Sequence, residues 1–352
     1  MRKYFVCELK RNRNALIVLT VLCALLAGVV MMNERLFYNA PLYDENWNYI
    51  PGKGRVVNYD GGMNFFCGML IVLCLFAPVY TYAFKMKKRS VDAMYSLPIK
   101  REGLYFVKSL IGLLLVFVPY TVAYLTGVSV VLVRENYFAL GWYAPFYFAS
   151  LGLGACLYFT YAFFFTRANT VADGIVFMLA WSFFFELALL LAVQGLNCLG
   201  LENWSELIKE HDYLDIQYSL LGGVLEATDF FSSLLGKKNV DFDAAFAQSL
   251  AFSVVCGGAA CALFFRGLKK EKAENAEQIS SSVWGYKFLI PAYVLLCVSN
   301  CSAELIVWII VWIAAIVSFI VYRRSVRLKW FDWASILAGF VLGVLLCGCF
   351  TL

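Results

Sequence analysis

Charged residues are scarce in this chain, and that scarcity excludes a soluble protein. Asp, Glu, Lys and Arg make up only 15% of the 352 residues, whereas 62% are hydrophobic. A soluble domain carries about 25% charged residues. This chain could not cover its surface with polar groups in water, so we expect it to lie in a lipid bilayer.

Histidine is nearly absent, which argues against a metal site. His211 is the single histidine. The twelve cysteines lie mostly inside apolar segments and form no CxxC pair or Cys/His cluster. Metal sites of ordinary ligand spacing need several such residues close together. We therefore expect no metal, and we interpret the cysteines as small hydrophobic residues.

The sequence also lacks the motifs of membrane enzymes and of ATP-binding chains. It has no Ser-His-Asp arrangement, no HExxH and no paired intramembrane aspartates. It has no GxxxxGK loop followed by Ser or Thr, so we do not expect it to bind ATP in that way. We predict no catalytic residues in this chain, and another subunit must supply the energy for any uphill transport.

Long apolar runs, in contrast, are abundant. A helix needs about 20 mostly apolar residues to cross the hydrocarbon core, and continuous runs without period-2 alternation favour helices over a barrel. Nine runs qualify: 15–32, 64–84, 104–133, 142–165, 174–196, 245–265, 283–300, 304–322 and 333–350. The seventh is the weakest, because Lys287 and Pro291 interrupt it. The first is too long for a cleavable signal peptide, so we expect a retained anchor.

The distribution of Lys and Arg predicts the orientation of these runs. With the N-terminus inside, 22 of the 29 Lys and Arg residues lie on the inner side, as the positive-inside rule requires. We therefore expect a cytoplasmic N-terminus, and nine spans put the C-terminus outside. That end flips if residues 283–300 do not cross. The positive charge suits anionic membrane lipid and indicates no nucleic-acid partner.

The polar segments divide the chain into four parts. Residues 1–14 are basic and mildly amphipathic, and form either an interfacial helix or a plain positive flank. Residues 15–265 hold six predicted spans. Residues 266–282 form a polar linker, which we expect to be cytoplasmic, and residues 283–352 form a three-span tail.

Two outer segments interrupt the six-span part. Residues 33–63 are rich in Pro and Gly and read as a loop with turns. Residues 197–244 form the longest segment between spans. Apolar residues at helical spacing around Trp204 and again over 220–225 predict one or two short helices there, on or within the outer leaflet.

Few charges lie within the predicted spans, and such charges are candidates for function. Glu186 lies near the middle of the fifth span, where it could face a substrate path or a subunit interface, or serve as a structural carboxyl. Asp173 and Lys108 lie near the inner ends of their spans, from which their side chains could snorkel towards water.

The loop over residues 85–101 is unusually basic for a connection. Six Lys and Arg side chains surround a single acid, Asp92. We predict a short helix that includes Val91, Met94, Tyr95 and Leu97, with Ser90 as its cap and Pro98 as its breaker. A rigid helix between two spans could pass a push from a docked protein to both; the alternative is a positive flank with an incidental turn.

The string RSVDAMYSLPIKREGLYFVKSL resembles the loop between the second and third spans in permease subunits of type-2 ABC exporters. The residues that carry the resemblance are Asp92, Ser96, Leu97, Pro98, Ile99, Lys100, Arg101 and Lys108. The linker over 270–276 partly fits a second family pattern, and Glu277 stands where glycine is frequent.

The resemblance implies an all-α polytopic membrane protein: a six-helix type-2 ABC exporter transmembrane domain plus about three extra C-terminal helices. It implies that residues 90–101 are a coupling helix that inserts into a cleft of a separate ATPase subunit, which binds ATP and Mg²⁺. The coupling residues would be Asp92, Tyr95, Ser96, Leu97, Pro98, Ile99, Lys100 and Arg101.

The resemblance also implies that two permeases, of the same or a related chain, pair to form the transport path. Spans one, two and five would line it, the 197–244 segment would cap it outside, and Glu186 would lie near the path or the dimer seam. We expect a bacterial plasma membrane exporter of amphipathic substrates such as peptides, lipids or hydrophobic toxins. The alternatives are an ion-coupled secondary transporter, an enzyme acting on lipid head groups, and a membrane sensor or immunity protein.

Overall fold

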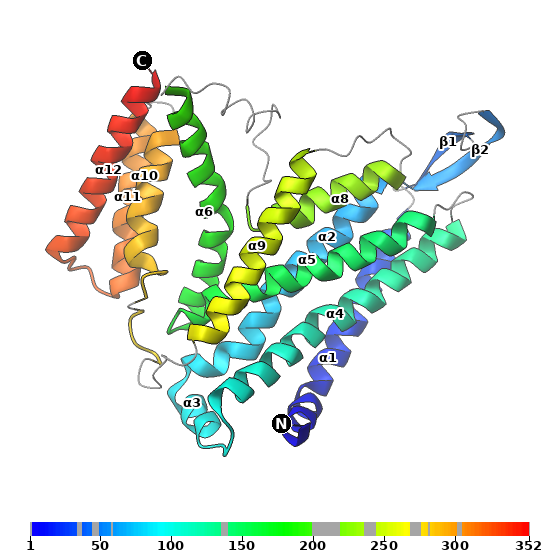
Figure 1. Cartoon of the computed structure of the whole chain (residues 1–352), viewed down its shortest axis with the longest axis horizontal. Coiled ribbons are helices and arrows are strands. Elements are labelled where there is room, and N and C mark those ends of the chain that lie inside the picture. The colour runs from blue at the N-terminus through cyan, green and yellow to red at the C-terminus, as the bar shows by residue number, and fades with distance from the viewer. Residues whose placement is uncertain are drawn as a thin grey trace. The chain divides into compact units, whose positions relative to one another are not determined.

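The described part of the chain is helical, apart from one small β-hairpin (Figure 1). This computed structural model describes residues 2–33, 37–43, 49–57, 59–134, 140–198, 219–235, 244–267, 276–280, 282–300 and 305–351. By their internal contacts these residues fall into two compact units. Unit 1 comprises Met1–Tyr82, Leu97–Ala162 and Leu221–Lys269, and unit 2 comprises Ala83–Ser96, Phe163–Leu220 and Lys270–Leu352.

The elements of the first half of the chain lie between Arg2 and Thr166. They are α1 (Arg2–Met31), β1 (Phe37–Tyr43), β2 (Tyr49–Val57), α2 (Tyr59–Tyr82), the short 3₁₀ helix η2 (Ala83–Met86), α3 (Lys88–Tyr95), α4 (Arg101–Arg134) and α5 (Leu140–Thr166). The second half contributes α6 (Val171–Cys198), α8 (Gly222–Leu235), α9 (Ala244–Gly267), α10 (Tyr286–Asn300), α11 (Leu305–Arg323) and α12 (Trp330–Thr351).

Eight helices in the described part of the chain are long and apolar enough to cross a membrane. They coincide with eight of the nine predicted spans, so the chain has the architecture of a multi-pass membrane protein. The exception is α10, which has 15 residues. At 1.5 Å per residue it extends about 22 Å, less than the roughly 30 Å of a hydrocarbon core. Residues 283–285 precede this helix instead of belonging to it.

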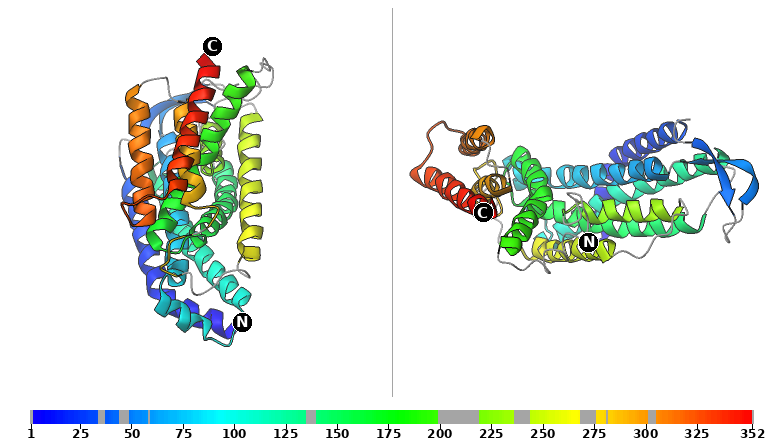
Figure 2. Two further views of the ribbon diagram at one scale, coloured as in Figure 1. Left: turned by 90° about the vertical axis from the view of Figure 1, so that its left-hand side faces the viewer. Right: turned by 90° about the horizontal axis from the view of Figure 1, so that it is seen from above.

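Unit 1 is organised around α4. Helix α1 packs along α4, α4 also packs on α2, and α8 packs on both α2 and α9 (Figures 1 and 2). Close approach of α4 and α5 depends on Gly112, because a Cβ added there would lie 2.0 Å from the Tyr158 hydroxyl oxygen. That hydroxyl also lies 3.3 Å from the Tyr82 hydroxyl of α2. A side chain at position 112 would therefore push α4 and α5 apart.

In unit 2, helices α6, α11 and α12 pack around α10. Helix α10 packs against α12, α11 and α6, and α12 also contacts α6 (Figure 2). A Cβ at Gly339 of α12 would lie 2.7 Å from the Pro291 carbonyl oxygen of α10, so glycine permits this close crossing. The predicted tail thus shares a compact unit with α6 and α3. The predicted domain boundaries themselves stay predictions.

Two predicted segments, 1–14 and 33–63, differ in form from the prediction, whereas α8 confirms a predicted short helix in the 197–244 segment. Residues 2–14 are helical, but they continue into the first span as one helix, α1. The expected loop over 33–63 contains a hairpin in which Phe37 pairs with Val57 and Tyr43 with Tyr49. In the 197–244 segment one helix, α8, is described; the prediction around Trp204 lies outside the described residues.

Candidate functional site: the 85–101 loop and its supports

Helix α3 fulfils the prediction of a short helix in the 85–101 loop, with a different start. It runs over Lys88–Tyr95, and its N-cap is Lys87, whose side chain makes no capping hydrogen bond. The predicted cap, Ser90, lies inside the helix, where its amide donates to the Lys87 carbonyl at 3.0 Å. The Ser90 prediction is wrong because the helix begins three residues earlier than its sequence pattern indicates.

The C-terminal end of α3 is a compact turn. Ser96 is the C-cap, and its amide donates to the Asp92 carbonyl at 3.0 Å. The Ser96 hydroxyl donates to the Ala93 carbonyl at 3.0 Å. Leu97 therefore lies outside the helix, contrary to the prediction, and Pro98 follows within the turn, as expected of a helix breaker.

Helix α4 starts directly after this turn. The Lys100 carbonyl accepts a hydrogen bond from the Leu104 amide at 3.1 Å, which begins the helical pattern. Arg101, predicted as the end of the coupling segment, is the first residue of α4. Only residues 96–100 separate the two helices in sequence.

The eight predicted coupling residues are distributed over an exposed surface with an apolar underside. Asp92, Ser96, Pro98, Lys100 and Arg101 are exposed, and Tyr95, Leu97 and Ile99 are half-buried. Within α3 itself only Val91 is buried. The helix therefore buries Val91, half-buries Met94 and Tyr95, and exposes its charged residues.

The linker contacts the first turn of α3. The Glu277 carboxylate accepts a hydrogen bond from the Lys88 amide at 3.3 Å, from a position 189 residues away in sequence. Glu277 has a backbone φ of +65°, in the left-handed region that side chains other than Gly and Asn rarely adopt. The first amides of a helix have no partners within the helix, and here a distant side chain supplies one.

The same linker segment is bound to the α5–α6 turn. The Glu277 amide donates to the Asn169 carbonyl at 3.1 Å, and the Asn169 side-chain amide donates to the Ile279 carbonyl at 3.4 Å. The Ser280 hydroxyl donates to the Arg167 carbonyl at 3.2 Å. Reciprocal bonds of this kind fix the linker against one turn of unit 2.

Two further contacts complete this arrangement. The Tyr322 hydroxyl, near the end of α11, donates to the Ser280 carbonyl at 2.9 Å. The Lys85 ammonium, in η2, donates to the carbonyl of Thr166 at the last turn of α5. A cation at a helix C-terminus is favourable, since unpaired carbonyls carry partial negative charge there. Elements η2, α3, α5, α6 and α11 are thus joined through polar contacts in unit 2.

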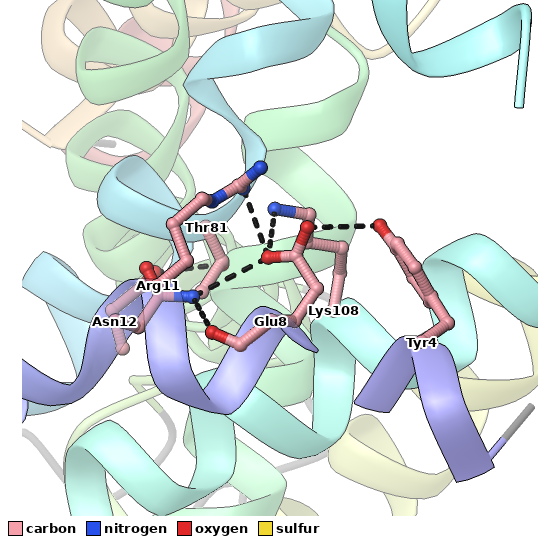
Figure 3. A network of polar contacts seen from close by, with 7 residues as sticks. Tyr4, Glu8, Arg11, Asn12, Thr81 and Lys108 are labelled. Carbon is pink, nitrogen blue, oxygen red and sulfur yellow. Dashed lines mark hydrogen bonds and ion pairs between the residues drawn. The ribbon is translucent and has the colours of Figure 1, made fainter. Parts of the chain in front are cut away.

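A second polar centre lies in unit 1, where α1 meets α4 (Figure 3). The Lys108 ammonium contacts the Glu8 carboxylate at 2.9 Å, and the two side chains are only 5% and 3% exposed. Arg11 contacts the same carboxylate at 2.8 Å. The Tyr4 hydroxyl donates to it at 3.1 Å, and the Asn12 side-chain amide donates to the Glu8 carbonyl at 2.7 Å and to its carboxylate at 3.3 Å.

This network corrects the expectation that Lys108 snorkels. Burying an ion pair carries a large desolvation penalty, which only good geometry and further hydrogen bonds can offset. Glu8 has both, since four side chains surround it. Glu8 was not predicted as a functional residue, because the apolar and basic residues dominate the pattern of residues 1–14. The signal was present in Tyr4, Glu8 and Asn12, which recur every fourth residue and so share one helical face.

The two remaining intramembrane candidates belong to α6. Glu186 is half-buried, and it lies about 22 Å along the helix axis from Val171, at 1.5 Å per residue. This depth agrees with its predicted place near the middle of the span. Asp173 lies in the first turn of α6, where its carboxylate accepts a hydrogen bond from the Tyr286 hydroxyl of α10 at 3.0 Å.

Among the described residues, no group of three or more His, Cys, Asp and Glu side chains is placed to hold a metal ion. Comparisons of the chain with protein-family models, with curated proteins and with solved structures find no match. The candidate site therefore rests on the geometry of the 85–101 loop, the linker and the Glu8 network.

Proposed function

We propose that this chain is the membrane-spanning subunit of an ATP-driven exporter, coupled to separate ATPase subunits. The observation that carries the proposal is α3, a short helix between two candidate spans whose exposed side is charged. Lys87, Lys88, Arg89 and Asp92 are all exposed there, while Val91 anchors the other side. Such a helix suits a docked partner with an acidic, partly apolar cleft.

The supports of the loop favour transmission of force over simple connection. At one end, the linker and the α5–α6 turn hold the start of α3. At the other end, α4 begins within five residues and is tied to α1 by the buried Glu8–Lys108 pair. A push on α3 would thus move α4 and α1 together. A loop that only connected two spans would need neither support.

The rest of the proposal follows the resemblance of the 85–101 loop to type-2 ABC permeases. Two such chains, the same or related, would form the transport path, with ATP and Mg²⁺ bound by the ATPase partner. The N-terminus and α3 would face the cytoplasm of a bacterial cell, and the substrate would be amphipathic. Glu186 would lie near the path or the dimer seam.

The test is co-purification of the tagged chain in mild detergent from its native host, with mass spectrometry and an ATPase assay on the eluate. An ABC ATPase is expected with the wild type. The double variant Asp92→Lys with Leu97→Asp should insert normally but lose most of the bound ATPase. It reverses the charge at position 92 of α3 and places a carboxylate at the apolar Leu97, just after the helix. Val326→Asp is the matched control, since Val326 is 81% exposed in the α11–α12 loop.

Two outcomes would redirect the proposal. A solitary chain in several detergents, with transport that follows an ion gradient, would favour a secondary transporter. A double variant that keeps full activity without any ATPase would favour a sensor or immunity protein, for which the charged surface of α3 has no docking role.

A further inference from the structure

Glu277 adopts an unusual backbone conformation for its residue type. Its φ of +65° is one of two positive values at non-glycine positions in the described chain, the other being +51° at Arg324. An L-residue with a Cβ is disfavoured in this region relative to glycine. A glutamate there requires a reason.

The side chain of Glu277 supplies that reason. Its carboxylate reaches the amide of Lys88 at 3.3 Å, at the positive end of α3, where a negative charge is favourable. The N-cap residue of α3 makes no side-chain hydrogen bond of its own. Glu277 therefore performs the role that Ser, Thr, Asp or Asn performs at an ordinary N-cap, but from another part of the chain.

The linker is positioned to make that contact reliable. The Glu277 amide and the Asn169 side chain form reciprocal bonds with carbonyls across the α5–α6 turn. Ser280 then bonds to this turn and accepts a hydrogen bond from Tyr322 of α11. A continuous series of hydrogen bonds thus joins the end of α11 to the beginning of α3.

We propose that Glu277 is a positioning residue that fixes the start of α3, and that the C-terminal helices brace α3 through this linker. The proposal deepens the proposed function, on which its consequence for coupling rests. The last three helices, α10, α11 and α12, would then have a part in coupling and would not be an independent sensor. They would hold the docking helix at the angle at which it transmits movement of the ATPase.

Three substitutions at one position separate this role from a purely local one. Glu277→Gly and Glu277→Asn both suit a left-handed backbone, but neither side chain is long enough to reach Lys88. Glu277→Gln keeps the length and an oxygen acceptor. Arg324→Gly is the matched control, since it relieves the same kind of backbone strain in the segment between α11 and α12.

The experiment is hydrogen–deuterium exchange on the full chain in lipid nanodiscs, followed in peptides that cover residues 88–96. Loss of the cap should speed exchange there about fivefold in Glu277→Gly and Glu277→Asn, with at most a twofold change in Glu277→Gln. Arg324→Gly should leave these peptides unchanged. Tyr322→Phe should raise exchange in the same peptides to a smaller extent, because it removes only the outer bond of the series.

Unchanged exchange over 88–96 in Glu277→Gly and Glu277→Asn would overturn the proposal, and so would a Glu277→Gln variant that exchanges as fast as Glu277→Gly. In the complex with its ATPase, the two short-side-chain variants should keep binding but lose several-fold in stimulated ATP hydrolysis. Faster exchange in a chain that never binds an ATPase would leave the positioning role standing and remove the exporter function instead.

Discussion

The two ends of the 85–101 loop are held by opposite kinds of contact. The α4 end is tied to α1 through Glu8 and Lys108, both almost fully buried and surrounded by further polar groups. The α3 end is held by an exposed hydrogen bond from the linker, by the bond from Lys85 to the Thr166 carbonyl and by the buried Val91. Buried charge contacts are costly to break and exposed ones are not, so one end is a fixed pivot and the other can be adjusted.

The largest effect is expected when the buried cation beside Glu8, at the α4 end, is removed. Lys108→Met should destabilise the protein by about 3 kcal/mol, the lower end of the range for a broken buried pair, because the Glu8 carboxylate loses its buried cation but keeps Arg11. Unfolding in a denaturing detergent series measures this. The double variant Glu8→Leu with Lys108→Met should recover much of the loss, since no unpaired charge then remains.

A matched substitution shows whether burial is the cause. Arg11 contacts the same carboxylate, but its side chain is 51% exposed. Arg11→Met should therefore change stability by less than about 1 kcal/mol. Equal losses in Arg11→Met and Lys108→Met would contradict the interpretation of a buried pivot.

The adjustable end is tested at its apolar contact. Val91→Ala removes two methyl groups from the one buried residue of α3 and should loosen that helix by about 1.5 kcal/mol, at roughly 0.8 kcal/mol per buried carbon. Faster amide exchange confined to residues 88–96 is expected, with global unfolding nearly unchanged. A general loss of stability would show that α3 belongs to the core instead of being a docked element.

The smallest expected effect is at Glu186, a half-buried residue of α6. Glu186→Gln should leave exchange at residues 88–96 and at the start of α4 unaltered, and should change transport more than assembly if the carboxyl faces the path. Flux into membrane vesicles and the amount of assembled protein are the two measurements. A collapse in assembled protein would mean that Glu186 is a structural carboxyl.

Most of the helices were predictable from the sequence, because a membrane helix reveals itself through a local run of apolar residues. Local pattern also predicted that a short helix precedes Pro98. It failed at the start of α3, since the capping group is Glu277 and no local window contains both partners. Ser90 was the best local choice, and it lies one turn too late.

The other differences have the same origin. Lys108 was interpreted as able to snorkel because it lies near the inner end of its span, whereas its partner Glu8 lies 100 residues earlier. The β1–β2 hairpin was missed because Pro41 and the Pro51-Gly52 pair indicate turns, while the pairing of Phe37 with Val57 depends on the partner strand. The candidate site is formed by contacts between residues that are far apart in the sequence. The spacing of apolar residues within one segment does not predict such contacts.

The bond from Tyr322 to Ser280 has a consequence for protein engineering. The polar linker makes the last three helices look like a detachable module that could be deleted after Gly267 or exchanged with that of a relative. Such a cut would discard Glu277 and Ser280 together with the helices, and a graft would succeed only if it carried residues 276–322 as one piece. The apparent boundary between residues 1–267 and the last three helices is thus a poor place to divide this gene.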